Sequence, residues 1–272
     1  MKKLKNSNSY ISEQHPFHMV DSSPWPIMTS ISLLSFVMVF VMYFHMFKFV
    51  NFVLLPVILI LCLNIFRWFS DIVVESTYEG QHTFKVQQGI RLGMCLFIIS
   101  EVMFFFSFFW GYFHCSLAPS ISIGYVWPPI NIISLDAWGL PLLNTIILLS
   151  SGITITCVHK AILIGERPFV INSLIWTIFY GIVFSVIQGY EYQVSPFSIN
   201  DSVFGSLFFM LTGFHGFHVF VGTIFLIVCL YRQINYHFIR KQHIGLECCI
   251  WYWHFVDVVW VLLFVIVYIW GG

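Results

Sequence analysis

Charged side chains are scarce in this sequence. Asp, Glu, Lys and Arg make up 9% of the 272 residues, whereas hydrophobic residues make up 59%. A soluble globular domain carries about 25% charged residues, so this chain lacks the polar side chains that a water-facing surface needs. The formal net charge is +0, and nothing in it indicates binding to nucleic acid. The composition therefore predicts an integral membrane protein.

The sequence also lacks the spacing patterns of metal sites and disulfide frameworks. Its 7 cysteines occur singly, except for the adjacent Cys248 and Cys249, and no C-x-x-C motif is present. No H-E-x-x-H motif occurs either. In apolar helices, cysteine behaves as a small hydrophobic residue. These motif patterns therefore identify no catalytic residue, no cofactor-binding residue and no metal ligand.

Long apolar runs account for most of the chain. A helix needs about 20 mostly apolar residues to cross a bilayer, and proline, glycine and polar residues separate runs of this length. The sequence therefore predicts an all-α membrane protein. Its seven transmembrane helices are expected at approximately Ile27–Phe44, Phe52–Phe69, Ile90–Phe113, Leu140–Lys160, Val170–Tyr190, Val203–Leu230 and Cys249–Trp270.

Basic residues mark one side of the predicted bundle. Lys48 lies in an odd-numbered connection, whereas the others lie in or beside the N-terminal tail and the even-numbered connections. Because inner loops carry the excess of Lys and Arg, seven spans put the N-terminus inside and the C-terminus outside. The residues on the inner side are Lys2, Lys3, Lys5, Arg67, Lys85, Arg91, Lys160, Arg167, Arg232, Arg240 and Lys241.

The third predicted span contains one acidic residue, Glu101, within the stretch FIISEVMFFF. An unpaired carboxylate at this depth is costly, so burial favours the neutral acid. Two interpretations stay open, a proton-relay or gating group and a protonated carboxyl that hydrogen-bonds to a neighbouring helix. We favour the second, because one carboxyl without a chain of partners moves no proton across a membrane.

The last two predicted spans contain two polar pairs with the same spacing. His215 and His218 are three residues apart in TGFHGFHVFVG, and His254 and Asp257 repeat this spacing in WYWHFVDVVW. Residues three apart share a helical face. Two facing helices with such pairs could bind zinc or a di-metal centre, and spacing alone leaves haem ligation open. Because we identify only Glu101 and Asp257 as deep acids, we favour interhelical hydrogen bonds.

Two of the predicted inner connections concentrate charged and histidine residues. Such residues either form solvated loops that pair with one another, or bind phospholipid head groups, because basic residues at an inner rim attract anionic phosphates. The second-to-third connection contains Arg67, Asp71, Glu75, Glu79 and His82, and the sixth-to-seventh contains Arg232, His237, Arg240, Lys241 and His243.

Several long sequence blocks follow one another in a distinctive order. They are HPFHMVDSSPWP, VVESTYEGQHT, GIRLGMCLFIISEVMFFFSFFWGYFHCSLAPS, WPP, PLLNTIILLSSG, YEYQVSPFSINDSVFGSLFF, TGFHGFHVFVGTIFL and WYWHFVDVVW. From about residue 15 to residue 271, this order resembles the family of cytochrome c oxidase subunit III of the mitochondrial type.

The resemblance implies a seven-helix subunit of the inner-membrane haem–copper oxidase, respiratory complex IV. An N-terminal tail and a two-helix bundle (residues 1–80) would be separated by a lipid-filled, V-shaped cleft from a five-helix bundle (residues 81–272). The subunit would stabilise the catalytic subunit I and support proton uptake and oxygen access during the reduction of O2 to water. Haem a and copper would belong to partner subunits, and the partners would be subunits I and II, accessory subunits and structural phospholipids.

The resemblance also assigns site residues and a location. It implies a mitochondrial inner-membrane protein with its N-terminus in the matrix and its C-terminus in the intermembrane space. Alanine occurs three times against 31 Phe, as in an AT-rich organelle genome, and the polar N-terminal tail shows no transit-peptide pattern, so mitochondrial encoding is expected. The buried polar residues would be Glu101, His215, His218, His254 and Asp257, and the lipid-binding residues Trp68, Glu75, Thr77, His82, Arg232 and His237.

Two other functions stay open. A proton-coupled membrane transporter would need a connected polar pathway across the bilayer, whereas the deep polar residues here are few. Subunit III of a related quinol oxidase is a nearer alternative. The N-terminal stretch SSPWP and the seven-span length favour the cytochrome c type.

Overall fold

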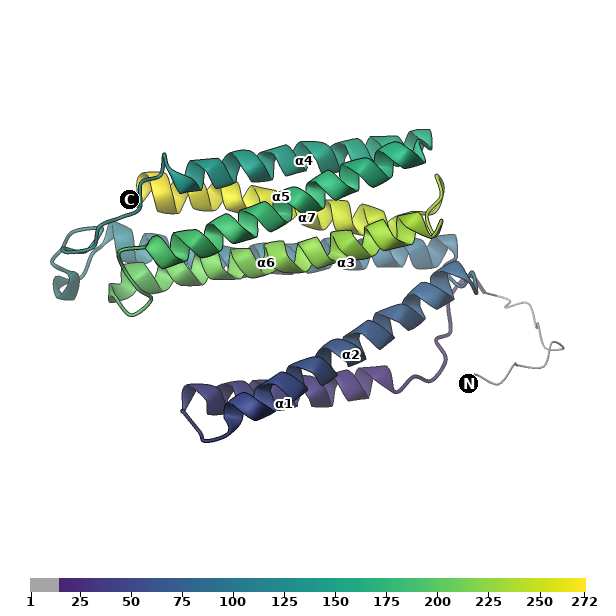
Figure 1. Ribbon diagram of the computed structural model, residues 1–272, viewed down its shortest axis with the longest axis horizontal. Helices are drawn as coiled ribbons and strands as arrows, with labels where there is room; N and C mark the ends of the chain where they lie inside the picture. The colour runs from purple at the N-terminus through teal and green to yellow at the C-terminus, as the bar shows by residue number, and fades with distance from the viewer. Residues whose placement is uncertain (1–14) are drawn as a thin grey trace. The chain divides into compact units, whose positions relative to one another are not determined.

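The computed structural model describes residues 15–272, and for Ser122 only the backbone. In this part of the chain 7 helices are long and apolar enough to cross a membrane, which confirms the predicted spans. The basic residues Lys2, Lys3 and Lys5 lie outside the described residues. The helices are α1 (Trp25–Phe44), α2 (Val50–Thr77), α3 (Phe84–Leu117), the short 3-10 helix η1 (Ile121–Ile123), α4 (Leu140–Ile164), α5 (Arg167–Val194), α6 (Ser202–Ile234), α7 (Ile244–Leu263) and its π-helical continuation η2 (Phe264–Trp270) (Figure 1).

Several helices are longer than the apolar runs that predicted them. α3 has 34 residues and α6 has 33, whereas about 20 residues cross the apolar part of a bilayer. The predicted third span begins at Ile90, but α3 already begins at Phe84 and includes Lys85 and Gln87. Polar residues are compatible with a helix at membrane-surface depth, so the apolar length underestimates the helix length.

Proline and glycine set several helix ends. Pro26, Pro141 and Pro168 lie in the first turn of α1, α4 and α5. A proline there sacrifices no helical hydrogen bond, because the first N–H groups have no partner within the helix. α4 ends at Gly165, whose left-handed φ of 92° suits glycine and whose N–H donates to the carbonyl of Ala161 at 2.8 Å. The chain then turns directly into α5, which packs against α4.

Contacts divide the chain into two compact units, Met1–Ile90 and Arg91–Gly272, called here the N-terminal and the C-terminal unit. The predicted boundary between residues 80 and 81 and the predicted lipid-filled cleft stay predictions.

In the N-terminal unit, polar side chains join α1 to α2. The amide Nδ2 of Asn64 donates to the carbonyl of Met28 and to Oγ of Ser32, both at 3.3 Å. At the start of α1, the indole N–H of Trp25 donates to Oδ2 of Asp71 at 2.7 Å. Polar contacts of this kind hold helices together in lipid, where apolar burial gives little driving force.

In the C-terminal unit, α7 is the most buried helix and packs against both α4 and α6. Its Trp253 is fully buried against two glycines of neighbouring helices. A Cβ atom would lie 2.8 Å from the indole ring if placed on Gly181, and 3.0 Å if placed on Gly222. Glycine at both positions therefore creates the space that the indole ring fills.

Candidate functional site

Glu101 of α3 and His218 of α6 form a hydrogen-bonded pair. Oε2 of Glu101 lies 2.9 Å from Nε2 of His218, and Nδ1 of the same ring lies 2.6 Å from the carbonyl oxygen of Phe214. A carbonyl oxygen only accepts, so Nδ1 carries a hydrogen and donates it. Nε2 and the carboxyl group then share one further proton. The expected hydrogen bond from Glu101 to a neighbouring helix is thus present, and its partner is the second histidine of the predicted pair.

His215 points to different helices from His218. Its side chain is fully buried, with ring centroids 5.7 Å from Phe184 of α5 and 5.1 Å from Trp260 of α7. Neither ring nitrogen has a hydrogen-bond partner among the described residues. The spacing of three residues therefore does not bring the two imidazoles to one ligand.

His254 and Asp257 face α4. Nε2 of His254 lies 3.5 Å from Oγ1 of Thr156, a long hydrogen bond. Asp257 is 7% exposed and lies beside Gly152, where a Cβ atom would be 2.6 Å from its Oδ2. Its Oδ1 has no hydrogen-bond partner among the described residues. The two polar pairs therefore do not converge on a common centre.

Tryptophans, rather than these titratable groups, join α7 to α4 by short hydrogen bonds. The indole N–H of Trp253 donates to Oγ of Ser151 at 2.8 Å, and that of Trp260 donates to Oγ1 of Thr145 at 3.0 Å. Sequence reasoning missed this role. The available signal was the position of both tryptophans inside the span, since interfacial tryptophans lie near span ends.

Sequence reasoning also missed a buried acid, Glu191. It lies near the end of α5 and is 1% exposed. Its Oε1 accepts hydrogen bonds from the hydroxyl of Tyr268 at 2.7 Å and from Nε2 of Gln188 at 3.2 Å, and Gln188 in turn accepts from Nδ2 of Asn144 at 3.3 Å. Glu191 is therefore a buried acid that the sequence did not identify. Glu191 was read as a loop residue because it follows the apolar run, although α5 continues to Val194.

One end of the C-terminal unit carries the α6–α7 loop, and the charged groups at this end form ion pairs with each other. This end, called here the loop end, also carries the α4–α5 turn (Figure 1). Arg91 donates from Nε to Glu247 at 2.8 Å and from Nη2 at 3.3 Å. Nε2 of the 4% exposed His243 lies 3.3 Å from the same carboxyl group. The predicted pairing of inner charges is thus present here.

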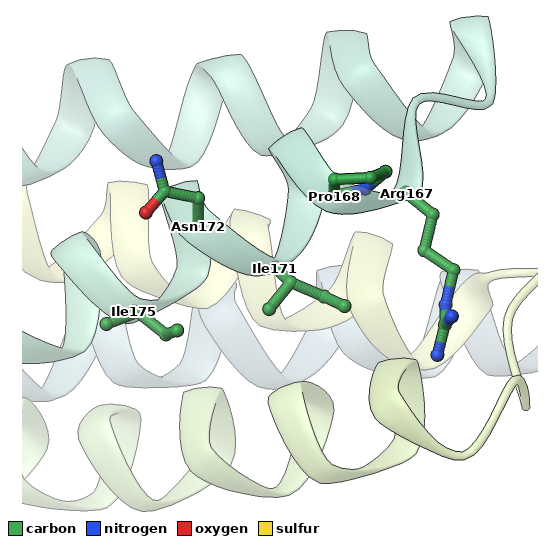
Figure 2. Close-up of a pocket in the computed structure, with 5 residues that line it drawn as sticks. All are labelled: Arg167, Pro168, Ile171, Asn172 and Ile175. Atoms are coloured by element: carbon green, nitrogen blue, oxygen red, sulfur yellow. The ribbon is translucent and has the colours of Figure 1, made fainter.

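Arg167 also donates hydrogen bonds at the loop end. Figure 2 shows its side chain extending from the start of α5 toward the end of α6, where Nη2 donates to the carbonyls of Gln233 at 3.1 Å and Ile234 at 2.6 Å. The side chain also borders a hollow of about 400 Å³. The guanidinium of Arg167 thus satisfies two carbonyls at the end of α6. The hollow is lined by Arg167, Pro168, Ile171, Asn172 and Ile175 (Figure 2).

The residues predicted to bind lipid divide between the two units. In the C-terminal unit, the guanidinium of Arg232 lies 4.5 Å from the ring centroid of Phe238. His237 lies in the α6–α7 loop, where partial burial and the nearby Arg232 lower the pKa of its imidazole. The N-terminal unit carries the others at the end of α2 and in the following loop. They are Trp68, Glu75, Thr77 and His82. Oε2 of Glu75 lies 3.4 Å from Nε2 of His18.

The fold and these polar groups define a class. The chain is a polytopic helical membrane protein in which each titratable group inside a span has its own neighbours. The part of the chain that the structure describes contains no group of three or more His, Cys, Asp or Glu residues that could hold a metal ion. The arrangement can stabilise helix packing and hold protons at fixed places.

Comparison with known proteins gives the family. The family model described as cytochrome c oxidase subunit III matches residues 15–272. Cytochrome c oxidase subunit 3 of Marchantia polymorpha is 52% identical over 262 residues, which cover 96% of this chain and 99% of that protein. The proteins of the same name from Pisaster ochraceus and Triticum aestivum are 50% and 51% identical, over 96% of this chain and 100% and 98% of theirs. The chain belongs to the cytochrome c oxidase subunit III family, a family of complex IV subunits.

Proposed function

We propose that this chain is a non-redox core subunit of cytochrome c oxidase. It stabilises the catalytic subunit I, binds structural phospholipids, and supports proton uptake and oxygen access during the reduction of O2 to water. Family membership and the names of its relatives support assembly into the oxidase. On this proposal, haem a and copper are held by partner subunits I and II, and accessory subunits complete the complex.

The main observation behind the proposal is that the titratable groups inside the spans point to different helices. His218 contacts α3, His215 packs against α5 and α7, and Asp257 faces α4. A transition-metal centre needs several ligand atoms that converge within roughly 2 Å of one ion. Groups that diverge in this way support helix packing and proton holding, which are the roles of an accessory subunit.

The main test is removal of this subunit from the purified oxidase. We expect the depleted enzyme to oxidise cytochrome c at first, because this chain supplies no electron carrier. Proton uptake should be slower at alkaline pH, and activity should decay progressively during turnover. Stopped-flow proton uptake and long turnover assays measure both effects, and adding the subunit back is the control. Immediate and complete loss of haem a reduction would contradict the proposal.

Phospholipid binding is proposed at the loop end near Arg232 and His237. A cation that lies over an apolar ring suits a lipid phosphate whose acyl chains continue along the helices, and basic groups at the inner rim attract anionic lipids. The residues Trp68, Glu75, Thr77 and His82 are proposed to do the same in the N-terminal unit. Arg232→Ala should lower the phospholipid retained after detergent washing, whereas the exposed Arg240→Ala is the matched control. Equal retention in both variants would contradict a head-group role for Arg232.

The proposed location is the mitochondrial inner membrane, with the N-terminus in the matrix and the C-terminus in the intermembrane space. The positive charges at the even-numbered connections support this orientation. Protease protection of terminal tags in mitoplasts tests it, with a matrix protein as the control. Finding both tags on one side would contradict the orientation.

A further inference from the structure

A strip of titratable side chains runs along the contact between α4 and α7. On α7, His243 precedes the helix, Glu247 lies in the first turn, and His254 and Asp257 follow at spacings of seven and three residues. Positions with such spacings lie on one helical face. The strip extends from the loop end to Asp257, about 21 Å along the axis at 1.5 Å per residue. Asp257 is the middle residue of the span Ile244–Trp270.

α4 supplies the opposite side of this strip. Gly152, Thr156 and His159 are four and three residues apart and share a face of the antiparallel helix. Gly152 lies against Asp257, Thr156 contacts His254, and His159 is close enough to interact electrostatically with both His254 and Glu247. His159 thus bridges the stretch between Glu247 and His254 on α7.

The strip lies at the edge of the helix contact, so that part of it is exposed on the surface of this chain. His159 and His254 are partly exposed and Thr156 is exposed, whereas Asp257 is buried. Proton transfer between such groups takes place directly or through one water molecule. Histidine suits this role because its charge changes near neutral pH.

The titratable groups of the strip make few short hydrogen bonds between α4 and α7. The short hydrogen bonds between α4 and α7 come from Trp253 and Trp260, whereas the contact between His254 and Thr156 is 3.5 Å long. Oδ1 of Asp257 has no hydrogen-bond partner among the described residues. Titratable groups on a helix surface inside a membrane are costly and mark proton or ion pathways.

The strip ends at Asp257. Between Val258 and Trp270 the only ionisable side chain is Tyr268, and its hydroxyl donates to Glu191. The other titratable groups near the centre of the unit face elsewhere, since His215 packs against Phe184 and His218 pairs with Glu101. Along α7, the titratable groups that share a face with Asp257 thus lie on its loop-end side.

We propose that the α4–α7 strip exchanges protons between the loop end and Asp257, which holds one proton at mid-membrane depth. In release, the carboxyl group of Asp257 gives its proton to the imidazole of His254. The imidazolium passes a proton to His159. From His159 the proton moves by way of the Glu247 carboxyl group, which Arg91 also contacts, to His243 at the loop end. One proton leaves, Asp257 becomes a carboxylate, and each imidazole is neutral again; loading is the reverse. This function goes beyond the proposed oxidase role and does not depend on it.

The test is the rate at which the Asp257 carboxyl group exchanges hydrogen for deuterium in the intact oxidase. An infrared difference spectrum against Asp257→Asn identifies its carboxyl band, and a switch to D2O moves this band to lower frequency. We expect His254→Gln and His159→Gln to slow the shift about tenfold or more, which corresponds to about 1.4 kcal/mol in the barrier. Both substitutions keep a polar side chain but remove the titratable ring.

Two controls separate a relay from a structural effect. The band of Glu191, identified with Glu191→Gln, should exchange at the same rate in His254→Gln as in the unchanged protein. His114→Gln, on the exposed surface of α3, should leave the exchange of Asp257 unchanged. Equal rates for Asp257 in all variants, or no carboxyl band lost in Asp257→Asn, would overturn the proposal. Normal proton uptake by the depleted oxidase would instead count against the proposed function, so the two failures are distinguishable.

Discussion

The two units of the chain hold their helices together in different ways. In α1 and α2, the buried residues include Thr29, Ser32 and Asn64, while large apolar side chains such as Phe52 are exposed to 78%. In the C-terminal unit, the largest fully buried side chains are aromatic, with Trp253 and Trp260 among them. Lipid solvates apolar side chains as well as a protein interior does, so apolar burial alone does not hold helices together in a membrane. The two units hold their helices together with different contacts.

Each set of contacts has its own energetic basis. The α1–α2 hairpin depends on a few polar contacts, each worth about 0.6 kcal/mol on average between membrane helices. The C-terminal unit combines close packing around glycine with hydrogen bonds from buried indoles. Dense packing gains many small dispersion contacts, and a hydrogen bond in its interior has no water to compete with. We therefore expect substitutions in the C-terminal unit to have the larger effects.

The largest effect is expected for Trp253→Ala. The substitution empties the space beside Gly181 and Gly222 and removes the hydrogen bond to Ser151. Truncation of a buried tryptophan costs roughly 3–5 kcal/mol. Detergent titration of the intact oxidase, followed by proteolysis of this subunit, measures the loss.

Trp176→Ala is the matched control, because Trp176 of α5 is 49% exposed. We expect it to change the free energy of unfolding by less than about 1 kcal/mol. Similar losses in both variants would mean that burial does not distinguish the two tryptophans, and the proposed difference between the units would lose its basis.

The next effect concerns the hydrogen bond from Tyr268 of η2 to Glu191 of α5. Tyr268→Phe keeps the ring but removes a donor from a buried carboxyl group, which costs about 1–3 kcal/mol. Tyr190→Phe is the control, since Tyr190 is 56% exposed. The same titration compares them, and equal stability of the two variants would show that Glu191 does not need its tyrosine partner.

Much of the fold could be predicted from the sequence because lipid imposes a simple rule. Backbone groups in a bilayer must bond within the helix, so apolar runs of sufficient length give the seven helices. Helix ends were predicted less well, as in α3, because polar residues at the membrane surface continue a helix without interrupting it. The same error placed Glu191 in a loop.

The site could be predicted only in part. The residue types and depth predicted Glu101, His215, His218, His254 and Asp257 as buried polar groups. Of these, His215, His218 and Asp257 are buried, whereas Glu101 and His254 are partly exposed. Spacing placed each pair on one face, but a face of a buried helix touches two or three neighbours. Whether His218 meets α3 while His215 meets α5 depends on helix crossing and on side-chain rotamers, which the sequence does not show.

A smaller effect is expected in the N-terminal unit. Asn64→Leu removes two hydrogen bonds of 3.3 Å between α1 and α2, so the loss should be about 0.6 kcal/mol and at most about 1.7 kcal/mol. Asn51→Leu, at an exposed position at the start of α2, is the control. The rate of proteolysis between α1 and α2 in the intact oxidase measures the difference. A loss as large as that of Trp253→Ala would contradict the difference between the units.

The smallest effect tests how far the desolvated interior of the C-terminal unit extends into its α6–α7 loop. Burial, and to a lesser extent the charge of Arg232, lower the pKa of His237 below its ordinary value of about 6.5. The folded state therefore favours the neutral imidazole. The loop keeps its full stability above the ordinary pKa and loses stability as pH falls through the lowered folded pKa. Limited proteolysis of the loop should accelerate across this interval, and His237→Gln should remove that part of the pH dependence.

Arg232→Gln separates the two causes of the shift. Removing the positive charge should raise the pKa of His237, but the value should stay below the ordinary one, because burial is the larger cause. NMR titration of histidine-labelled oxidase, with the signal assigned by His237→Gln, measures the pKa. The exposed Lys241→Gln is the control for a general change in charge and should shift it less. A complete return to the ordinary pKa in Arg232→Gln would show that burial does not extend into the loop. The desolvated interior that distinguishes the C-terminal unit would then be confined to its helices.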